Sequence, residues 1–421
     1  MKHIFSTIAL LLCLVQTAVA QQLQQAIDYS TYIKVVAADN IEYAAEKLNV
    51  VISDAELSAA KVFNDFTLSA TYYDNDDRQM MMGYGAEFEL SKNISFGVRR
   101  SRIDLAKNEK ALNEALLEDY FRNLRATSTA IYVEALKQQE LHRLLEDSYE
   151  NIHQLAQSDS IRFVAGEIAQ VDARKSRLEA DILHNELVLS EADLYRSFAT
   201  LGVQMGRSVR DTLYCPIAVM RPLEREFNVD SLLYVAYDNR ADLEAAMLNE
   251  NVAAAALKLA HSERNTDIEL SIGANVNSVV RNEIAPAPSF TGITAGIAVP
   301  LKFSNFNKGA IRAAQSRQQQ AQRQTDQIRL QIEADVMQTY NRYILLTKQV
   351  YHCEQHLLTD ARQVLDGMLY SYNRGEVSLL EVLSAQNTYN DVRRQYIELL
   401  CNQMLSLIDL ELSAGIWDIE L

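Results

Sequence analysis

The stretch SYNRGEVSLLEVLSAQ, Ser371 to Gln386, decides the fold because it places one isolated glycine inside a long helical pattern. A glycine that ends a helix adopts the left-handed conformation at low cost, so Gly375 can end one helix. Ser378 can then cap the next helix, with Glu381 three residues later completing a capping box. The stretch therefore predicts a tight turn between two long helices.

A second stretch, SIRFVAGEIAQVDARKS, Ser160 to Ser176, resembles the first and lies about half a chain earlier. The corresponding pairs are Gly166 and Gly375, Glu167 and Glu376, and Asp172 and Glu381. Other segments recur at a similar offset. Because the offset varies slightly, the sequence indicates an old duplication with loop insertions rather than a short repeat.

Long helices are predicted on both sides of these turns. The 421-residue chain has only 13 Gly and 5 Pro. Residues 97–163 contain no proline, and a helix of that length spans roughly 100 Å. After the second turn, apolar and aromatic residues alternate steps of three and four, which is typical of a coiled-coil seam. These seam positions are Val382, Ala385, Tyr389, Val392, Tyr396 and Leu399. Such helices must pack along each other or along neighbouring chains.

Four strands are predicted, because apolar residues recur at every second place or gather on one face. The strands lie at about residues 65–73, 83–91, 267–277 and 289–299. Each approaches the ~9–11 residues that cross a bilayer as a tilted strand, and Glu87, Glu89 and Glu269 would then face water. A soluble sheet with one wet face is the alternative for any single strand. Four strands cannot close a lipid-facing barrel with a usable lumen, so the sequence predicts a homo-oligomer that shares one barrel.

The N-terminus has the features of a secretory signal peptide. An apolar run, Ile8 to Val15, precedes the sequence Ala18-Val19-Ala20, which fits a cleavage site. We therefore expect residues 1–20 to be removed. Cys13 leaves lipidation as an alternative, although Leu12 is not the small residue that normally precedes a lipidated cysteine.

The charge balance and the motifs exclude several functions. The chain has 40 Lys and Arg against 56 Asp and Glu, and phosphate binding needs a basic face, so no nucleic-acid partner is expected. No nucleotide loop or nucleophile motif is present, so neither an enzyme nor a cofactor is expected. His352 and His356 have a spacing that can bind zinc, but no further ligand is near in sequence. A solvated helix face is therefore the favoured interpretation of the pair, and we expect no metal; a metal site at the two histidines remains the alternative.

Two repeats, each with a strand hairpin and a long helical hairpin, resemble the TolC-type outer-membrane efflux proteins. The resemblance covers essentially all of the chain after residue 20. The segments that carry it, besides the glycine turns, are FGVRRSRIDLAK (Phe96–Lys107), RADLEAAMLNENVAAAALKLA (Arg240–Ala260) and VPLKFSNFNKGAIRAA (Val299–Ala314). The first and third segments are most similar to members that serve divalent-metal or copper/silver pumps.

The resemblance implies a mainly α fold with β strands. Each chain of a trimer would contribute four strands to a twelve-stranded barrel and its helical hairpins to a periplasmic α-barrel. The implied division is a first repeat at 21–205, a connecting, equatorial segment at 206–238 and a second repeat at 239–421.

The implied function is a passive duct of a tripartite, RND-type efflux system. Such a duct lies in the lipid of the outer membrane, extends into the periplasm, and docks onto a periplasmic adaptor (membrane fusion) protein and an inner-membrane pump. Its substrates would be small molecules or metal cations. A duct for type I protein secretion and a non-channel periplasmic coiled-coil or adaptor protein remain alternatives.

The resemblance also implies a gate at the hairpin turns. The family's gate tyrosine falls on Tyr372 and its aspartate partner on Asp172, and such hydrogen bonds can hold an entrance closed. Glu381 falls on an aspartate of an acidic ring, which favours cations. The family's gate arginine falls on Val377 and its second acidic ring on Ser384, so closure by apolar contact is expected at Val377. The residues expected to form the turns and contact the adaptor are Gly166, Glu167, Gly375 and Glu376.

Overall fold

The computed structural model describes residues 23–210, 212–301 and 306–420. The expected signal peptide and Cys13 lie outside the described residues. The chain divides into two compact units, one made of residues up to 45, 120–240 and 331–421, and the other of residues 46–119 and 241–330. Among the described residues, no helix is both long and apolar enough to cross a membrane.

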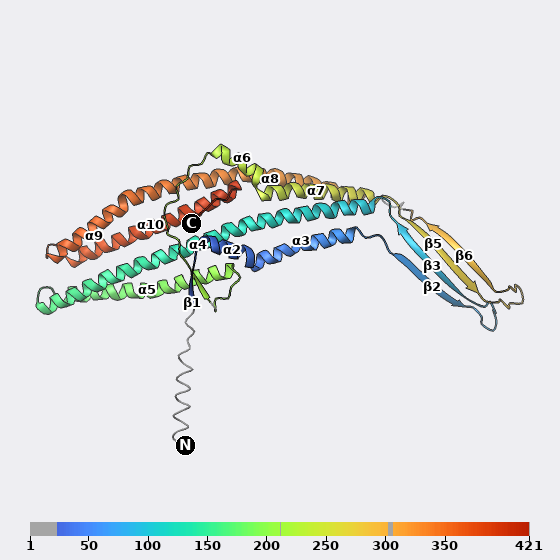
Figure 1. The fold of residues 1–421 in the computed structure, drawn as a ribbon, viewed down its shortest axis with the longest axis horizontal. Helices are drawn as coiled ribbons and strands as arrows, with labels where there is room; N and C mark the ends of the chain where they lie inside the picture. The colour runs from blue at the N-terminus through green and yellow to red at the C-terminus, as the bar shows by residue number, and fades with distance from the viewer. Residues whose placement is uncertain (1–22, 211, 302–305, 421) are drawn as a thin grey trace, which may run out of the picture. The chain divides into compact units, whose positions relative to one another are not determined.

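The first unit is mostly helical (Figure 1). Its helical elements are α2 (Tyr29–Asp39), the second part of α4 (Val98–Ala165), α5 (Gln170–Gln204), α6 (Val229–Asn239), the end of α8 (Lys308–His352), the π-helix η1 (Cys353–Leu357), α9 (Leu358–Asn373) and α10 (Leu379–Ala414). Two short strands, β1 (Leu23–Ile27) and β4 (Thr212–Pro216), pair in parallel. The hydroxyl of the fully buried Tyr132 donates to the Ile27 carbonyl at 3.0 Å, which joins this small sheet to α4.

Two helical hairpins extend from this unit: α4 and α5 form one, and α9 and α10 form the other (Figure 1). The seam expected on α10 is present but wider. Val382 and Ala385 are buried, and the four later seam positions are half-buried. Leu383, Ile397 and Leu400 are buried as well, so α10 packs a broader face than a seam of two positions per heptad.

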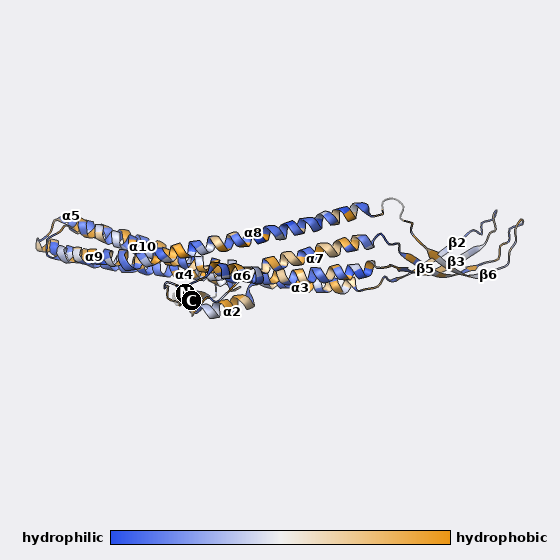
Figure 2. Ribbon diagram, turned by 90° about the horizontal axis from the view of Figure 1, so that it is seen from above, coloured by the Kyte–Doolittle hydropathy of each residue, from blue (hydrophilic) through white to orange (hydrophobic). Residues whose placement is uncertain are grey.

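Helix α8 has a much narrower buried stripe than α10. Figure 2 shows α8 as hydrophilic over most of its length. Its buried residues mostly recur at steps of four and seven and are Ile311, Ala314, Ala321, Thr325, Ile332, Val336, Tyr343 and Val350. A stripe of this width leaves most of the helix surface to water or to polar neighbours.

The second unit joins helices to an antiparallel sheet of order β2-β3-β5-β6. Its helices are most of α3 (Ile41–Ala60), the first parts of α4 and α8, and α7 (Ala241–Ser262). Its strands are β2 (Phe66–Asp74), β3 (Tyr84–Ile94), β5 (Ile268–Asn277) and β6 (Phe290–Ala298). Each strand begins one residue after the start that the alternation of the sequence predicts.

The register of this sheet separates its apolar from its polar side chains, because directly opposed residues share a face. One row across the four strands is Leu68, Leu90, Ile272 and Ala295. The next row, on the other face, is Ser69, Glu89, Gly273 and Thr294. Glu87 and Glu269 share the face of Glu89 by the same register. All three glutamates therefore lie on the polar face.

The apolar face of the sheet is open in the described chain. Leu68 is 72% exposed and Ile293 is 82% exposed. Strand β2 is exposed along its whole length. The described residues of this chain therefore leave the apolar face uncovered, although its side chains are of the kind found in a protein core.

Candidate functional site

The two hairpin turns have the same backbone geometry. Gly166 has φ +81° and Gly375 has φ +77°, both in the left-handed region. The Glu376 N–H donates to the Ser371 carbonyl at 3.0 Å and the Gly375 N–H to the Tyr372 carbonyl at 2.9 Å. The equivalent pair of bonds closes α4 at Gly166. Both helices thus end in a Schellman motif, which explains why each turn needs a single glycine and no proline.

The caps of the returning helices differ between the two turns. At the second turn, Ser378 precedes α10 and forms a capping box with Glu381. The Ser378 N–H and hydroxyl donate to Glu381 Oε2 at 2.7 Å and 2.9 Å. At the first turn, Ala169 occupies the capping position of α5 without a side-chain bond. The difference follows from the residue types, because alanine has no side-chain oxygen to accept the capping bond.

A buried tyrosine–carboxylate pair lies close to the turns. The Tyr372 hydroxyl on α9 donates to Asp159 Oδ1 on α4 at 2.8 Å, and both side chains are buried. Arg162 lies 3.9 Å from the same oxygen, with its guanidinium 5.1 Å from the centre of the Tyr372 ring. Burial, and then the bond to Asp159, raise the pKa of Tyr372, so the phenol keeps its proton and remains the donor. The bond joins the two helical hairpins of one chain.

This pairing differs from the sequence expectation, which gave Tyr372 the partner Asp172. Asp172 lies in the first turn of α5, half-buried, and acts on Tyr372 only through its charge. One signal for Asp159 is nevertheless present in the sequence. Ile152, Ala156 and Asp159 follow steps of four and three, so the carboxylate falls on the buried seam of α4. A charged residue in a seam position requires a polar partner.

The other expected gate residues lie on α10 or just before it. Val377 is half-buried and packs against an apolar cluster that includes Ile152 and Leu379, so an apolar contact does form at this position. Glu381 and Ser384 are exposed. The pKa of Glu381 lies below its usual range because the Ser378 N–H and hydroxyl bond to the carboxylate, which therefore keeps its negative charge.

The acidic residues beside the glycines form ion pairs within their own turns. Arg162 Nε lies 3.5 Å from a Glu167 carboxylate oxygen, and Arg374 Nε lies 2.9 Å from one of Glu376. Neither pair was expected from the sequence. Each turn therefore pairs its exposed glutamate with an arginine of the preceding helix end, and Arg162 is shared with the buried Asp159.

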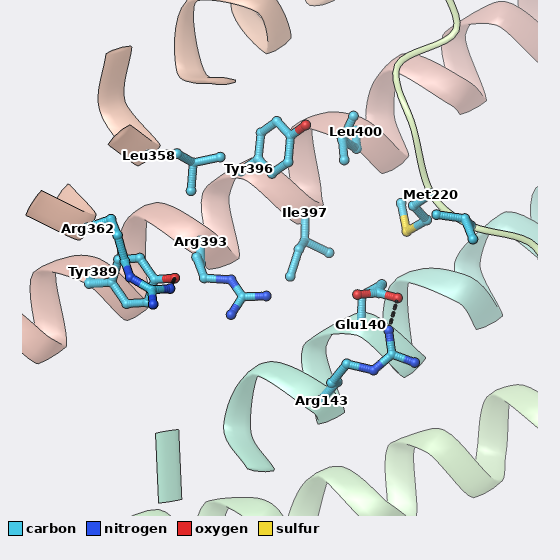
Figure 3. A pocket seen from close by; sticks show the side chains of 11 residues that line it. Glu140, Arg143, Met220, Leu358, Arg362, Tyr389, Arg393, Tyr396, Ile397 and Leu400 are labelled. Carbon is cyan, nitrogen blue, oxygen red and sulfur yellow. Dashed lines mark hydrogen bonds and ion pairs between the residues drawn. The ribbon is translucent and has the colours of Figure 1, made fainter. Parts of the chain in front are cut away.

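Farther from the turns, a groove of about 460 Å³ lies between α4 and the α9–α10 hairpin. Figure 3 shows Arg362 against Tyr389, and Arg143 bonded to Glu140 of the same helix, α4, at one side of the groove. Arg393 lies 3.4 Å from a carboxylate oxygen of Asp147. Because every arginine of the groove already has a polar partner, the groove offers no open anion site.

Arg225, which lies before α6, is held to α10 by a charge cluster around the buried Glu411. Arg225 Nη1 bonds to Glu411 Oε1 at 2.8 Å and also to Asp418. The Asp418 N–H donates to Glu411 Oε2 at 3.1 Å. Burial raises the pKa of Glu411 to about 8, whereas the hydrogen bond from Glu411 holds the pKa of Asp418 below its usual range. The members of this cluster have no recognisable spacing in the sequence, so no local pattern predicts it.

His352 and His356 have a metal-binding spacing in the sequence, for which a solvated helix face was the favoured interpretation. Within the part that the structure describes, no group of three or more histidine, cysteine or acidic side chains is arranged to hold a metal ion. His352 and His356 do come together, with ring centres 5.3 Å apart.

Comparisons with known proteins agree with this fold. Residues 232–415 match the family model for the outer membrane efflux protein. The cobalt-zinc-cadmium resistance protein CzcC of Cupriavidus metallidurans is 24% identical over 312 residues, 72% of this chain and 70% of that protein. Among solved structures, CusC superposes with a TM-score of 0.75 over 92% of both chains at 16% identity. VceC of Vibrio cholerae superposes with a TM-score of 0.72 over 92% of this chain and 95% of that one, at 17% identity.

The family match covers residues 232–415, and the likeness in fold extends over 92% of the chain. By the match of residues 232–415 and by its fold, the chain is therefore similar to the outer membrane efflux proteins.

Proposed function

We propose that this chain is the outer-membrane channel of a tripartite efflux system, a passive duct from the periplasm to the exterior. The observation that carries the proposal is the two-faced sheet. Its apolar face, with Leu68 and Ile293 exposed, suits lipid. Its opposite face carries Glu87, Glu89 and Glu269 and suits a water-filled interior.

The proposed assembly is a trimer, an expectation supported by the edges of the sheet. Strands β2 and β6 are its outermost strands. In lipid an open edge would leave backbone groups without partners, so β2 of one chain has to pair with β6 of the next. Three chains would then close a twelve-stranded barrel. Their helical hairpins would form the periplasmic α-barrel.

In this assembly the hairpin turns form the periplasmic entrance. Tyr372 and Asp159 would hold the two hairpins of a chain together. The charge of Asp172 would act on Tyr372, and Val377 would pack against the apolar cluster beside the pair. Glu381 would contribute negative charge to the throat. The exposed turns would contact the adaptor, and the proposed contact residues are Gly166, Glu167, Gly375 and Glu376. The proposed repeats remain residues 21–205 and 239–421, joined by 206–238.

The proposed partners are a periplasmic adaptor protein and an inner-membrane pump, and the proposed cargo is a divalent metal cation. The similarity to a cobalt-zinc-cadmium resistance protein favours this cargo over drugs. A duct for type I protein secretion would share the fold, but that sequence similarity does not favour it. A non-channel periplasmic protein would leave the two-faced sheet without a role.

Planar-bilayer recording tests the duct. The purified protein should run as a trimer and open ion-conducting pores, and a monomer without conductance would overturn the proposal. Cargo is tested separately in a deletion strain. If the deletion strain is sensitive to cobalt, zinc or cadmium and the reintroduced gene restores resistance, metal export is supported. Sensitivity to drugs alone would refute it.

A further inference from the structure

We propose that His352 and His356 form a surface binding site for one divalent cation of the imidazole-preferring class, namely Cu²⁺, Ni²⁺ or Zn²⁺. The two histidines stand at the end of α8 and within η1. Both are exposed, so a cation can reach them from solvent. The site is independent of the duct itself and goes beyond the proposed function.

The separation of the two rings fits a shared ion. Their centres are 5.3 Å apart and their planes are tilted by 52°. With metal–nitrogen bonds of about 2.0–2.1 Å, each ring centre lies about 3.2 Å from a bound ion, which puts two ring centres about 5.2 Å apart at a tetrahedral angle. The observed separation of the ring centres is thus compatible with a shared cation, which the rings reach by turning one nitrogen each toward it.

The backbone at this point is a second, independent observation. Residues Cys353–Leu357 form a π-helical turn, in which the Leu358 N–H donates to the Cys353 carbonyl five residues earlier. Such turns are rare, and they occur disproportionately at functional sites because they re-aim side chains at some cost in helix geometry. Here the turn begins directly after His352 and contains His356, while Cys353 is buried beneath it.

The ligand count defines what kind of site this is. The part of the chain that the structure describes supplies two protein ligands here and not a set of three or four. Water has to complete the coordination, so this is an open surface site rather than a structural zinc site. Hard cations prefer oxygen ligands, so Mg²⁺ and Ca²⁺ should not compete.

Copper titration of the full-length protein, purified without a histidine tag, tests the proposal. We expect one Cu²⁺ per chain, with an electron paramagnetic resonance spectrum that shows two imidazole nitrogens. H352N or H356N should each weaken binding roughly tenfold or more, because the second ligand acts at high effective concentration, and should leave one nitrogen. Zn²⁺ should displace the copper, and excess Mg²⁺ should not.

The matched control is H261N, which removes a single exposed histidine at the end of α7. It should leave copper binding unchanged. A two-nitrogen signal that survives in the double variant H352N/H356N, or a single-nitrogen signal in the unaltered protein, would overturn the site. Conductance should be the same in all these variants, so failure of the cation site and failure of the duct remain distinguishable.

Discussion

Tyr372 and Asp159 stand 213 residues apart in the sequence, and a buried hydrogen bond of 2.8 Å joins them. The bond runs from α9 to α4, and thus from one helical hairpin to the other. Asp159 Oδ2 has no hydrogen-bond partner among the described residues. Loss of the tyrosine hydroxyl would therefore leave a buried carboxylate with Arg162, 3.9 Å away, as its nearest cation.

Y372F should loosen the contact between the hairpins. An unsatisfied buried group costs about 1–3 kcal/mol, so we expect lower stability and a higher basal conductance in planar bilayers. Because Asp159 is the partner in the structure, Y372F should couple with D159A by about 1 kcal/mol or more in a double-mutant cycle.

D172A is the matched control for this cycle, because Asp172 lies close to Tyr372 but does not accept its hydrogen bond. Its coupling with Y372F should stay below about 0.5 kcal/mol. Strong coupling to Asp172 and none to Asp159 would show that the working entrance uses the pairing expected from the family rather than the one described here.

G375A should destabilise the second hairpin. Gly375 has φ +77°, and an alanine in the left-handed region costs about 1–2 kcal/mol. A Cβ would meet nothing within 4 Å, so the cost is one of backbone conformation and not of collision. Thermal unfolding of the purified protein measures it.

Gly367 provides the internal control for this change. It lies inside α9, and a Cβ there also meets nothing within 4 Å. G367A should therefore stabilise the protein by up to about 1 kcal/mol, because alanine is the better helix former. Equal effects of G367A and G375A would contradict the role of the left-handed turn.

The Glu411 cluster should make stability depend on pH. The pKa of this carboxyl is raised in the folded protein to about 8 from its ordinary value of 4.5. Its contribution to stability is therefore fully present below about pH 4.5 and is lost as the pH rises through about 8, because ionisation is easier in the unfolded chain.

E411Q should flatten this dependence, because glutamine keeps the shape without a titrating group. The unaltered protein should lose thermal stability between about pH 5 and pH 9, and the variant should lose less. The charge on Arg225 acts in the opposite direction. A variant that is less stable than the parent at pH 9 would show that the ionised pair with Arg225 is the favoured state.

The elements of this protein follow from local sequence, whereas its long-range pairs do not. Alternation over about nine residues is enough to place β2 and β6, and one glycine with its neighbours determines each turn. The partner of Tyr372 depends on how two hairpins meet, and nothing near Tyr372 in the sequence encodes that. The sequence marks Asp159 as a candidate only because it is a charged residue at a buried seam position of α4. The pair of Arg225 and Glu411 has no such local signal.

The two faces of the sheet allow a sharp test of the membrane assignment. Leu68 and Ser69 are neighbours on β2, both exposed in the described chain, and the register puts them on opposite faces. L68R would place a charge against lipid, at a cost of about 2–4 kcal/mol near the middle of the bilayer. S69R would place the same charge beside Glu89 on the wet face.

We therefore expect L68R to deplete assembled trimer from the outer-membrane fraction, while S69R assembles normally. S69R should change conductance instead, because a positive charge enters a face that carries glutamates. Arginine is identical in both variants and the sites are adjacent, so strand propensity and expression level cannot explain a difference between them. If the two variants assembled equally well, the apolar face would not contact lipid, and the duct would need another way to cross the membrane.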